Sequence, residues 1–483
     1  MIPVVDLFAG PGGLNEGFSS FRTDGRQVFK TVASFEMDRV ACETLTLRTA
    51  MRALAAGGDF PDVYYSFLNG RLDWRAFQAN PKVSKALLDA GGEIHQLELG
   101  REVERTDAAI GAALGSDRED PWVLIGGPPC QAYSLVGRSR RRHDKKFEDD
   151  VKHFLYREYL RIIEKFRPAV FVMENVKGLL SSRHKGVGMF DRILADLQRP
   201  GYVIHSFTTT RGPGEIGPKD YVIRAEEHGV PQARHRVILL GVREDLTGVK
   251  YLPLAKGNTV SVREALEHLP RIRSQVSPLR MDSEDLWRSC RLKAMDLAES
   301  RRKRAVPATS GSDFGGAGIS RTKQGELEAW LADARLESLS QHRARAHMPE
   351  DLIRYGFLAA RAERGDFIKL DQLPDSLKPN HANANRPDAP FKDRFRVQRW
   401  SDPSTTVVSH IAKDGHYYIH PDPGQMRSLT VREGARLQTF PDNYYFCGNR
   451  TQQYHQVGNA VPPRLAVQLA GVVDQVLHST GAQ

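Results

Sequence analysis

The chain has 483 residues, of which 40% are hydrophobic and 27% charged, as in soluble globular proteins. This length exceeds that of one average domain, so we expect two domains. The formal net charge of +10 and the pI near 9.4 favour a polyanionic partner. No apolar run approaches the length of a membrane span, and no cationic segment precedes the apolar start PVVDLF. We therefore expect neither a membrane anchor nor a signal peptide.

The four cysteines lie far apart, at positions 42, 130, 290 and 447. No CxxC pair is present, so we expect neither a zinc site nor dithiol redox chemistry. This usage fits a reducing cytosol, and we expect a cytoplasmic protein, nucleoid-associated if its polyanionic partner is DNA. In that compartment a lone thiol is either inert or catalytic.

Up to about Arg243, short β-rich runs alternate with helical stretches. The runs are PVVDLF, TVASFE, PWVLIG, AVFVME, YVIHSFTTT and RVILLGV. Continuous apolar strands of this kind belong to a sheet covered on both faces, so we expect an α/β fold. The charged, helical stretch between Leu45 and Asp120 is interpreted as an insertion on the surface of this domain.

After about Glu244 the composition changes, which indicates a second, smaller domain of mixed structure. In it, the alternation of VVSHIAKDGHYYIHPD predicts a β-hairpin that turns at Asp414-Gly415. The segments LTVREGARLQTF and PPRLAVQLAGVVDQVL predict amphipathic helices. We expect a first domain of residues 1–250 completed by 452–483, a second domain of 251–425 and a hinge of 426–451.

A glycine-rich turn, AGPGGL, joins the first strand to the first helix and contains Gly10 and Gly12. Glycines at this point let the backbone approach a ligand, and the helix N-terminus offers free amides. The turn is not a P-loop, because no Gly-Lys-Ser/Thr follows. Asn15 stands where a GxGxxG motif would have its third glycine. From this turn alone, a plain strand–helix connection is an equally good interpretation.

Glu36 ends the second predicted strand, TVASFE. At that place a carboxylate can accept both ribose hydroxyls of an adenosine cofactor, so together with the turn it favours a nucleoside ligand. Asp73, in GRLDW, is a candidate for the adenine amino group, and an ordinary surface acid is an equal alternative.

The segment IGGPPC presents the thiol of Cys130 after a predicted strand, at the sheet edge where α/β proteins bind ligands. The two prolines stiffen the turn that holds it. Sulfur is a strong nucleophile even when only a small fraction is thiolate. An isolated cysteine is more often a buried small hydrophobe, but this position favours a catalytic thiol.

Charged side chains surround this thiol in the predicted sheet. The basic run 137–146 adjoins it, which favours phosphate contact over a plain solvated loop. The next strand brings Glu174 and Asn175 to the same edge, where a partly buried carboxyl could bond a base nitrogen; a helix cap is the alternative. Alternation places Arg234 and Arg236 on one face, where a guanidinium can hold a carbonyl oxygen.

Together these segments resemble the cytosine-5 DNA methyltransferases of bacterial type, either solitary or from restriction–modification systems. The resemblance rests, in the family's order, on DLFAGPGGLNEGF, the strand end at Glu36, GGPPCQAYS, ENV, QARHR, RSLTVREGARLQTFP and QVGNAVPPRLA. These blocks occupy under half of the chain but span nearly its whole length. The resemblance implies a Rossmann-like S-adenosylmethionine-dependent methyltransferase sheet, with a smaller target-recognition domain between QARHR and RSLTVRE.

The resemblance also implies methyl transfer from S-adenosyl-L-methionine to a cytosine flipped out of duplex DNA. Cys130 would attack carbon 6, Glu174 would hold ring nitrogen 3, and Arg236 would bind the 2-carbonyl oxygen. No segment identifies the base that removes the carbon-5 proton. The implied partner is double-stranded DNA, without a membrane. We expect a monomer, and a cognate restriction endonuclease encoded nearby if the chain belongs to such a system.

The candidate site residues form three groups. The catalytic group is Cys130, Glu174, Arg234, Arg236, Gln131 and Asn175. The cofactor-binding group is Asp6, Phe8, Ala9, Gly10, Gly12, Gly13, Leu14, Glu36, Met37, Asp73, Pro128, Asn459 and Val461. The DNA-binding group is Ser134, Arg138, Arg140 and Arg141, and no residue is assigned to a metal.

Two rival functions follow from the same residues. An RNA cytosine-5 methyltransferase would share the chemistry, but such relatives tend to lack a large recognition domain. A non-catalytic DNA-binding regulator would not need Cys130, Glu174 and Arg236 together. The second domain has no motif that predicts the recognised bases, and we expect solvent or phosphate contact for its histidines at 342, 347, 381, 410, 416 and 420.

Overall fold

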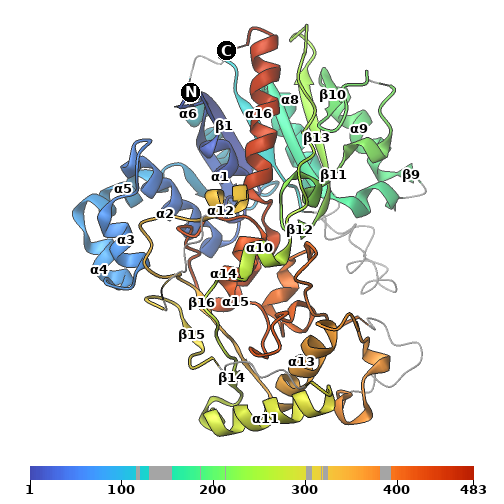
Figure 1. Cartoon of the computed structure of the whole chain (residues 1–483). Coiled ribbons are helices and arrows are strands. Elements are labelled where there is room, and N and C mark those ends of the chain that lie inside the picture. The colour runs from blue at the N-terminus through green and yellow to red at the C-terminus, as the bar shows by residue number, and fades with distance from the viewer. Residues whose placement is uncertain are drawn as a thin grey trace. The chain divides into compact units, whose positions relative to one another are not determined.

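The structure is a computed structural model that describes residues 1–115, 120–129, 155–184, 187–212, 214–300, 307–316, 318, 325–380 and 393–482. The chain divides into two compact units. Unit 1 comprises Met1–Asp59, Pro81–Asn258 and Ala460–Gln483, and unit 2 comprises Phe60–Asn80 and Thr259–Asn459. Figure 1 labels their elements.

Unit 1 is built on an eight-stranded sheet. Its main path has the order β10 (Tyr202–Ser206), β13 (His235–Arg243), β7 (Val170–Val176), β6 (Val123–Gly126), β1 (Ile2–Leu7), β4 (Phe29–Glu36) and β5 (Ile94–Gln96), and β11 (Val222–Arg224) pairs with β13. The neighbours from β7 to β5 are parallel, whereas β13 is antiparallel to β7. The carboxyl ends of β7, β6, β1, β4 and β5 therefore meet the amino end of β13 at one edge.

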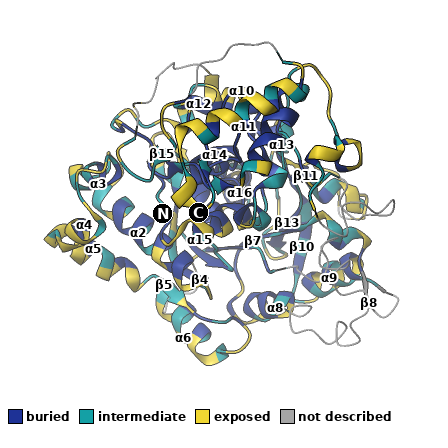
Figure 2. Cartoon of the chain, turned by 90° about the horizontal axis from the view of Figure 1, so that it is seen from below, coloured by how far each residue is buried: buried dark blue, intermediate teal, exposed yellow. Residues whose placement is uncertain are grey.

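Alternating strand residues enter two separate cores, one on each face of the sheet. Leu124 and Phe171 belong to the core beneath α8 (Leu155–Phe166) and α9 (Met189–Gln198). Val123 and Val170, one position earlier, belong to the opposite core. Successive side chains of a strand point to opposite faces of the sheet, so neighbouring residues enter different cores. Figure 2 shows buried residues on one side of α8 and exposed ones on the other. The expected α/β sheet, covered on both faces, is confirmed.

The last helix, α16 (Pro463–Ser479), packs on the first, α1 (Gly13–Ser20), and so completes unit 1. The red and dark-blue helices are seen together in Figure 1. A Cβ atom on Gly13 would lie 2.1 Å from the Val461 oxygen, and one on Gly17 would lie 2.3 Å from the Ala466 Cβ. Only glycine permits this close approach, which joins the C-terminal segment to the glycine-rich turn.

The stretch expected to be a surface insertion is shared between the two units. Helices α2 (Arg39–Ala55), α5 (Pro81–Gly91) and α6 (Val103–Leu114) belong to unit 1, with strand β5 among them. Helices α3 (Asp62–Leu68) and α4 (Trp74–Ala79) belong to unit 2. There the Tyr64 hydroxyl donates to the Asn443 oxygen at 2.7 Å, and the Tyr65 hydroxyl donates to Asp333 at 2.6 Å.

Unit 2 has mixed structure with little sheet in its described residues. Its further helices are α10 (Val262–Leu266), α11 (Glu284–Leu297), α12 (Gly325–Leu331), α13 (Pro349–Ala362), α14 (Val431–Leu437) and α15 (Arg450–Asn459). Two-residue strands pair β14 (Gln275–Val276) with β17 (Ala346–His347) and β15 (Gly311–Ser312) with β16 (His342–Arg343). The core lies between α11 and α13 and includes Trp287 and Tyr355.

The β-hairpin predicted around Asp414-Gly415 is wrong. The segment forms two 3-10 turns, η9 (Ser409–Ala412) and η10 (His416–Tyr418). Gly415 has a φ of 76°, and the Tyr418 amide donates to its oxygen, so the chain coils tightly here. Ile419 pairs with Val397 and Ser428, which are partners from outside the predicted hairpin.

In the described part of the chain, no helix has the length and apolar character needed to cross a membrane.

Candidate active site

The turn between β1 and α1 has a strained, open backbone. Phe8, Gly10 and Gly12 have φ values of 56°, 54° and 89°. For Phe8 this left-handed conformation is unfavourable, and such strain is typical of ligand-binding turns. The Ala9 amide donates to the Phe35 oxygen at 3.0 Å, which anchors the turn to β4. No side chain caps α1, so its first amides face the turn.

Glu36 ties this turn to the start of α2. One carboxylate oxygen accepts the Gly10 amide at 2.9 Å, and the other accepts the amides of Met37 and Asp38, also at 2.9 Å. Burial raises the pKa of Glu36, although these three amides act in the opposite direction. Each carboxylate oxygen has two lone pairs, so the group can still accept hydroxyls from a ligand.

Asp6 is buried at the end of β1 without a hydrogen-bond partner. The residue is 1% exposed, and neither carboxylate oxygen is bonded. Burial raises the pKa of Asp6 well above its usual range; the negative charge of Glu36 adds to this, and the positive charge of Arg52 opposes it. An unbonded buried carboxylate is costly, so this group fits a site that receives a donor or a cation from a ligand.

The structure has a strand beside Glu36, β5, that the sequence analysis missed. Strand β5 places Gln96 opposite Glu36, and the Leu97 amide donates to the Glu36 oxygen at 3.1 Å. Glu98 follows directly. Asp73 instead lies in unit 2, where its side chain caps α4 through the Ala76 amide at 2.7 Å. The signal for β5 was the short run EIHQLE after Gly-Gly, within a stretch that otherwise looked helical.

Met37 follows Glu36 and is 64% exposed, although it is a large apolar residue. Single exposed apolar residues are common, but this one directly follows the carboxylate that faces the turn. It is therefore available to cover an apolar face of a ligand held by Glu36.

The turn after β6 lies directly against Glu174. A Cβ atom on Gly126 would lie 2.5 Å from the Leu7 oxygen, and one on Gly127 would lie 2.9 Å from Glu174 Oε2. Pro128 is buried, and Pro129 is the last described residue before Cys130. The predicted positions Cys130, Gln131, Ser134, Arg138, Arg140 and Arg141 lie outside the described residues.

Glu174 and Arg236 form an ion pair at the same edge, with Arg236 Nε 2.8 Å from Glu174 Oε1. Their side chains are 14% and 15% exposed, so each can still be reached. Asn175 is buried, and its side-chain oxygen accepts the Val176 amide at 2.7 Å. Arg234 is also buried, two residues before Arg236. An acid and a guanidinium thus converge beside the Gly-Pro-Pro turn.

The three described cysteines are all buried. Burial raises the pKa of the Cys42 thiol to about 12, and burial also raises the pKa of Cys290. A thiol with a raised pKa is a poor source of thiolate. Cys42 and Cys290 are therefore poor candidates for a nucleophile.

The remaining two cofactor candidates lie on either side of a unit boundary. Asn459 is exposed at the end of α15 in unit 2, and Val461 is buried in unit 1 beside Gly13.

The chain matches a family model over residues 116–475, which covers the turn at Gly127, the Glu174–Arg236 pair and most of unit 2. That model describes the C-5 cytosine-specific DNA methylases. The chain belongs to this family.

Its relatives among the DNA methylases extend over the whole chain. It is 34% identical to the type II methyltransferase M.Bpa9945I of Bacillus paralicheniformis, over 98% of this chain and 99% of that protein. It is 25% identical to the DNA (cytosine-5-)-methyltransferase M.ApeKI of Aeropyrum pernix, over 98% of each. The chain is therefore an enzyme of this class, a DNA (cytosine-5-)-methyltransferase, and its family uses S-adenosylmethionine.

A solved structure of similar fold is described as a DNA modification methyltransferase encoded within an Escherichia coli prophage. The alignment with this structure has a TM-score of 0.57 and 19% sequence identity, and it covers 99% of this methylase and 100% of the other chain. The similarity supports the mixed α/β fold around a large central sheet.

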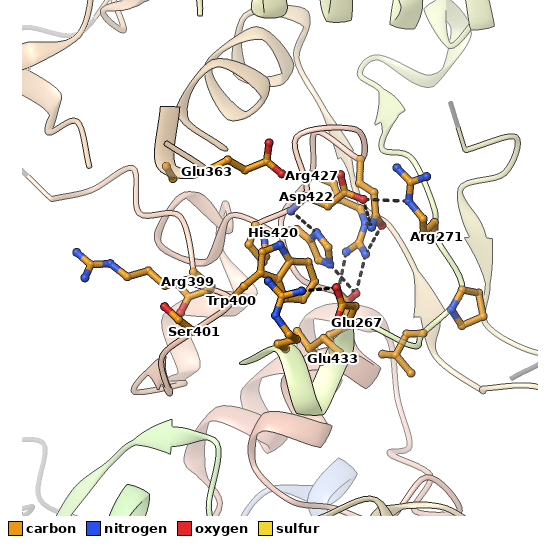
Figure 3. A pocket seen from close by; sticks show the side chains of 18 of the residues that line it. Glu267, Arg271, Glu363, Arg399, Trp400, Ser401, His420, Asp422, Arg427 and Glu433 are labelled. Carbon is orange, nitrogen blue, oxygen red and sulfur yellow. Dashed lines mark hydrogen bonds and ion pairs between the residues drawn. The ribbon is translucent and has the colours of Figure 1, made fainter. Parts of the chain in front are cut away.

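The methylase block RSLTVREGARLQTFP forms a buried ionic network in unit 2, and its Arg427 and Glu433 line a cavity of about 610 Å³ (Figure 3). Arg427 binds both oxygens of Glu433 at 2.6 Å, and Arg271 binds Asp422 at 2.9 Å. Burial lowers the pKa of His420 beside this network. These charges are paired inside the unit, so the block holds its segments together.

The expectation that the histidines of this region contact solvent or phosphate is wrong for three of them. His342, His347 and His420 are 4%, 5% and 2% exposed. His342 bonds the Thr430 hydroxyl at 3.1 Å, and His347 bonds the Ser428 hydroxyl at 3.1 Å. Among the described residues, no group of three or more His, Cys, Asp and Glu could hold a metal ion. These histidines are internal hydrogen-bonding groups.

Proposed function

We propose that this methylase moves a methyl group from S-adenosyl-L-methionine to carbon 5 of a cytosine flipped out of duplex DNA, with Cys130 as the covalent nucleophile. The observation that carries the proposal is the Glu174–Arg236 pair, which packs against Gly127, three residues before Cys130.

Unit 1 has the groups that an adenosyl cofactor with an amino-acid tail requires. Glu36 can accept the ribose hydroxyls, Met37 can cover the adenine, and Glu98 or Gln96 can meet its amino group. The unbonded Asp6 suits a cationic ligand group. Phe8, Ala9, Gly10, Gly12, Gly13, Leu14, Pro128 and Val461 complete the set proposed in unit 1, and Asn459, which belongs to unit 2, stays a proposed cofactor contact. When bound, the cofactor supplies an electrophilic methyl group on a sulfonium.

The protein groups act on the cytosine ring. The Cys130 thiolate forms a bond to carbon 6, while Glu174 hydrogen-bonds ring nitrogen 3 and supplies a proton there. Arg236 holds the 2-carbonyl oxygen, with Arg234 and Asn175 supporting that edge. Carbon 5 thereby becomes nucleophilic and takes the methyl group. A base then removes the carbon-5 proton, the electron pair of that bond forms the carbon 5–carbon 6 double bond and expels the sulfur as thiolate, and nitrogen 3 returns its proton to Glu174.

The reaction requires an extruded base, because carbon 6 cannot be reached inside the stack. Extrusion costs a few kcal/mol of stacking and pairing. Phosphate contacts must offset this cost, and Arg138, Arg140 and Arg141, together with Ser134 and Gln131, follow the nucleophile in sequence. Unit 2 would select the duplex sequence, because it supplies about two hundred residues outside the catalytic sheet.

We also propose that the protein acts in a restriction–modification system, since M.Bpa9945I and further relatives are named type II methyltransferases. We propose that it acts as a monomer, because one chain suffices for the reaction. A cognate endonuclease would then cut the same sequence. Genomic DNA from a host that expresses the methylase would resist that endonuclease and show a single methylated motif by bisulfite sequencing.

The decisive experiment compares methyl incorporation into duplex DNA and into transfer RNA with tritiated S-adenosylmethionine. We expect incorporation into DNA alone, and none for Cys130→Ser. Cys290→Ala, a buried cysteine in unit 2, is the matched control and should keep activity. Incorporation into transfer RNA alone, or normal turnover by Cys130→Ser, would overturn the proposal.

A further inference from the structure

Asn15, which departs from the glycine motif, is a connecting residue beneath the cofactor turn. It is 1% exposed on α1. Its side-chain amide donates to the Ser34 hydroxyl of β4 at 3.2 Å, and its side-chain oxygen accepts Arg52 Nη2 of α2 at 2.6 Å. Arg52 Nη1 also donates to the Asn15 backbone oxygen at 3.4 Å. A glycine here would lose both side-chain contacts and keep only the longer bond from Arg52 to the backbone oxygen.

A second arginine, one turn earlier on α2, also binds α1. Arg48 binds both oxygens of Glu16, at 2.9 Å through Nε and at 2.5 Å through Nη2. The side chains are 5% and 3% exposed, and Arg48 holds the pKa of Glu16 below its usual range against the cost of burial. Residues four apart lie on one helix face, so both arginines point toward α1.

Helix α2 therefore connects Glu36, at one side of the proposed cofactor site, with α1 at the other. Its N-terminus follows Glu36 directly, and Asp38 caps it by accepting the amides of Val40 and Ala41 at 2.9 Å. Its C-terminal turn carries Arg52, which holds α1 through Asn15. A shift of α2 would move Glu36 relative to the glycine turn, although neither Asn15 nor Arg52 belongs to that turn.

Arg52 also acts on the unbonded carboxylate through its charge. The ionisable groups that influence Asp6 come from three elements: Glu36 on β4, Arg52 on α2 and Tyr159 on α8. Among these, Arg52 is the cation. Without it, Asp6 would meet only groups that are neutral or negative, and the uncharged form of Asp6 would be favoured further.

We propose that Asn15 and Arg52 are positioning residues for S-adenosylmethionine: their contact fixes α1 and its glycine turn against α2, the helix that follows Glu36. The inference rests on the proposed function. It stands on the Asn15–Arg52 contact, and the Arg52 charge, which opposes the raised pKa of Asp6, supports it. The Arg48–Glu16 pair joins the same two helices through a contact of its own.

The test measures the dissociation constant of S-adenosylmethionine by calorimetry between pH 5.5 and 8.5, on the full chain. Arg52→Met should weaken binding about tenfold, the size of one charge-assisted hydrogen bond. It should also move the acid limb, which is the fall of cofactor affinity at low pH, to higher pH. Arg52→Lys should restore the acid limb. Asn15→Ala should weaken binding without moving the acid limb, because the charge remains.

The matched control is the double variant Arg48→Met/Glu16→Gln, which removes the neighbouring pair without leaving a buried lone charge. It should lower the melting temperature and leave the acid limb in place. Arg52 is only partly buried, so we expect Arg52→Met to fold, and Asn15→Ala tests the contact independently. All variants should bind a DNA duplex with the affinity of the wild type.

If Arg52→Met binds S-adenosylmethionine like the wild type, or loses affinity equally at every pH without moving the acid limb, the inference is wrong. If the wild type itself does not bind the cofactor, the proposed function fails as well. These two failures are distinguished by the wild-type titration alone.

Discussion

Glu174 and Arg236 reach the same point from strands that run in opposite directions. Glu174 lies near the carboxyl end of β7 and Arg236 near the amino end of β13, and the two are joined at 2.8 Å. The register sets Arg236 opposite Val176, two residues beyond Glu174. The antiparallel strand therefore brings a guanidinium to an edge where parallel neighbours bring acids and the Gly-Pro-Pro turn.

Glu174→Gln should reduce kcat by about 10²-fold to 10⁴-fold, because an amide cannot supply a proton to ring nitrogen 3. Cofactor affinity should stay within about threefold of the wild type. Single-turnover methylation at saturating DNA checks this. Glu158→Gln, a similarly buried acid paired with Arg161, is the control. Full activity of Glu174→Gln would remove this residue from the chemistry.

Gly127→Ala should lower kcat by about tenfold or more, since its Cβ would lie 2.9 Å from Glu174 Oε2 and displace the carboxylate or the turn. Stability should change little. Gly91→Ala, where nothing lies within 4 Å of the added carbon, serves as control. Equal activity of the two variants would show that the carboxylate tolerates displacement.

Asp6→Asn should stabilise the free protein and weaken cofactor binding. Burial raises the pKa of Asp6 in the folded state. The folded state then binds more protons than the unfolded state between the ordinary and the raised pKa, so stability falls as pH rises through this window. At pH values above this window, removing the charge should raise the free energy of unfolding by about 1–3 kcal/mol. Thermal melting over a series of pH values, with and without S-adenosylmethionine, measures both effects. An Asp6→Asn variant that is less stable than the wild type at every pH without ligand would contradict this account.

Glu36→Ala should weaken S-adenosylmethionine binding by about 10²-fold, the size of two hydrogen bonds to a charged group, and leave DNA affinity nearly unchanged. It also leaves the amides of Gly10, Met37 and Asp38 without their acceptor. Calorimetry with each ligand separately shows which of the two affinities falls more. A larger loss for DNA than for the cofactor would mean that the ribose lies elsewhere.

The triple variant Arg138→Gln/Arg140→Gln/Arg141→Gln should reduce the slope of log affinity for DNA against log salt by about 2.7, if each arginine neutralises one phosphate. Binding to all sequences should weaken alike, because phosphate contacts carry no sequence information. Fluorescence anisotropy over a salt series measures the slope. An unchanged slope would place these arginines away from the backbone.

The strands and the ligand edge could be predicted from sequence because each depends on local pattern. Apolar runs located β1, β4, β6, β7, β10 and β13, and position at a strand end singled out Glu36 and Glu174. Strand β5 was missed because its three residues, Ile94–Gln96, lie in a helical stretch and pair with β4 over a long sequence separation.

Other features depend on contacts between segments that are distant in sequence. The alternation around Gly415 looked like a hairpin, yet Ile419 pairs with Val397 and Ser428. Residues 60–80 looked like surface elaboration, but Tyr64 and Tyr65 bond residues far along the chain. No local pattern indicates that Asn15 meets Arg52 or that Asp6 lacks a partner.

Mass spectrometry of the methylase incubated with S-adenosylmethionine and a target duplex containing 5-fluorocytosine tests the central claim most directly. The fluorine cannot leave as a proton does, so the covalent adduct should persist. The account predicts a peptide with Cys130 bonded to the methylated fluoropyrimidine, and none from Cys130→Ser. Complete methylation of natural DNA without any such adduct, or an adduct on another residue, would contradict it.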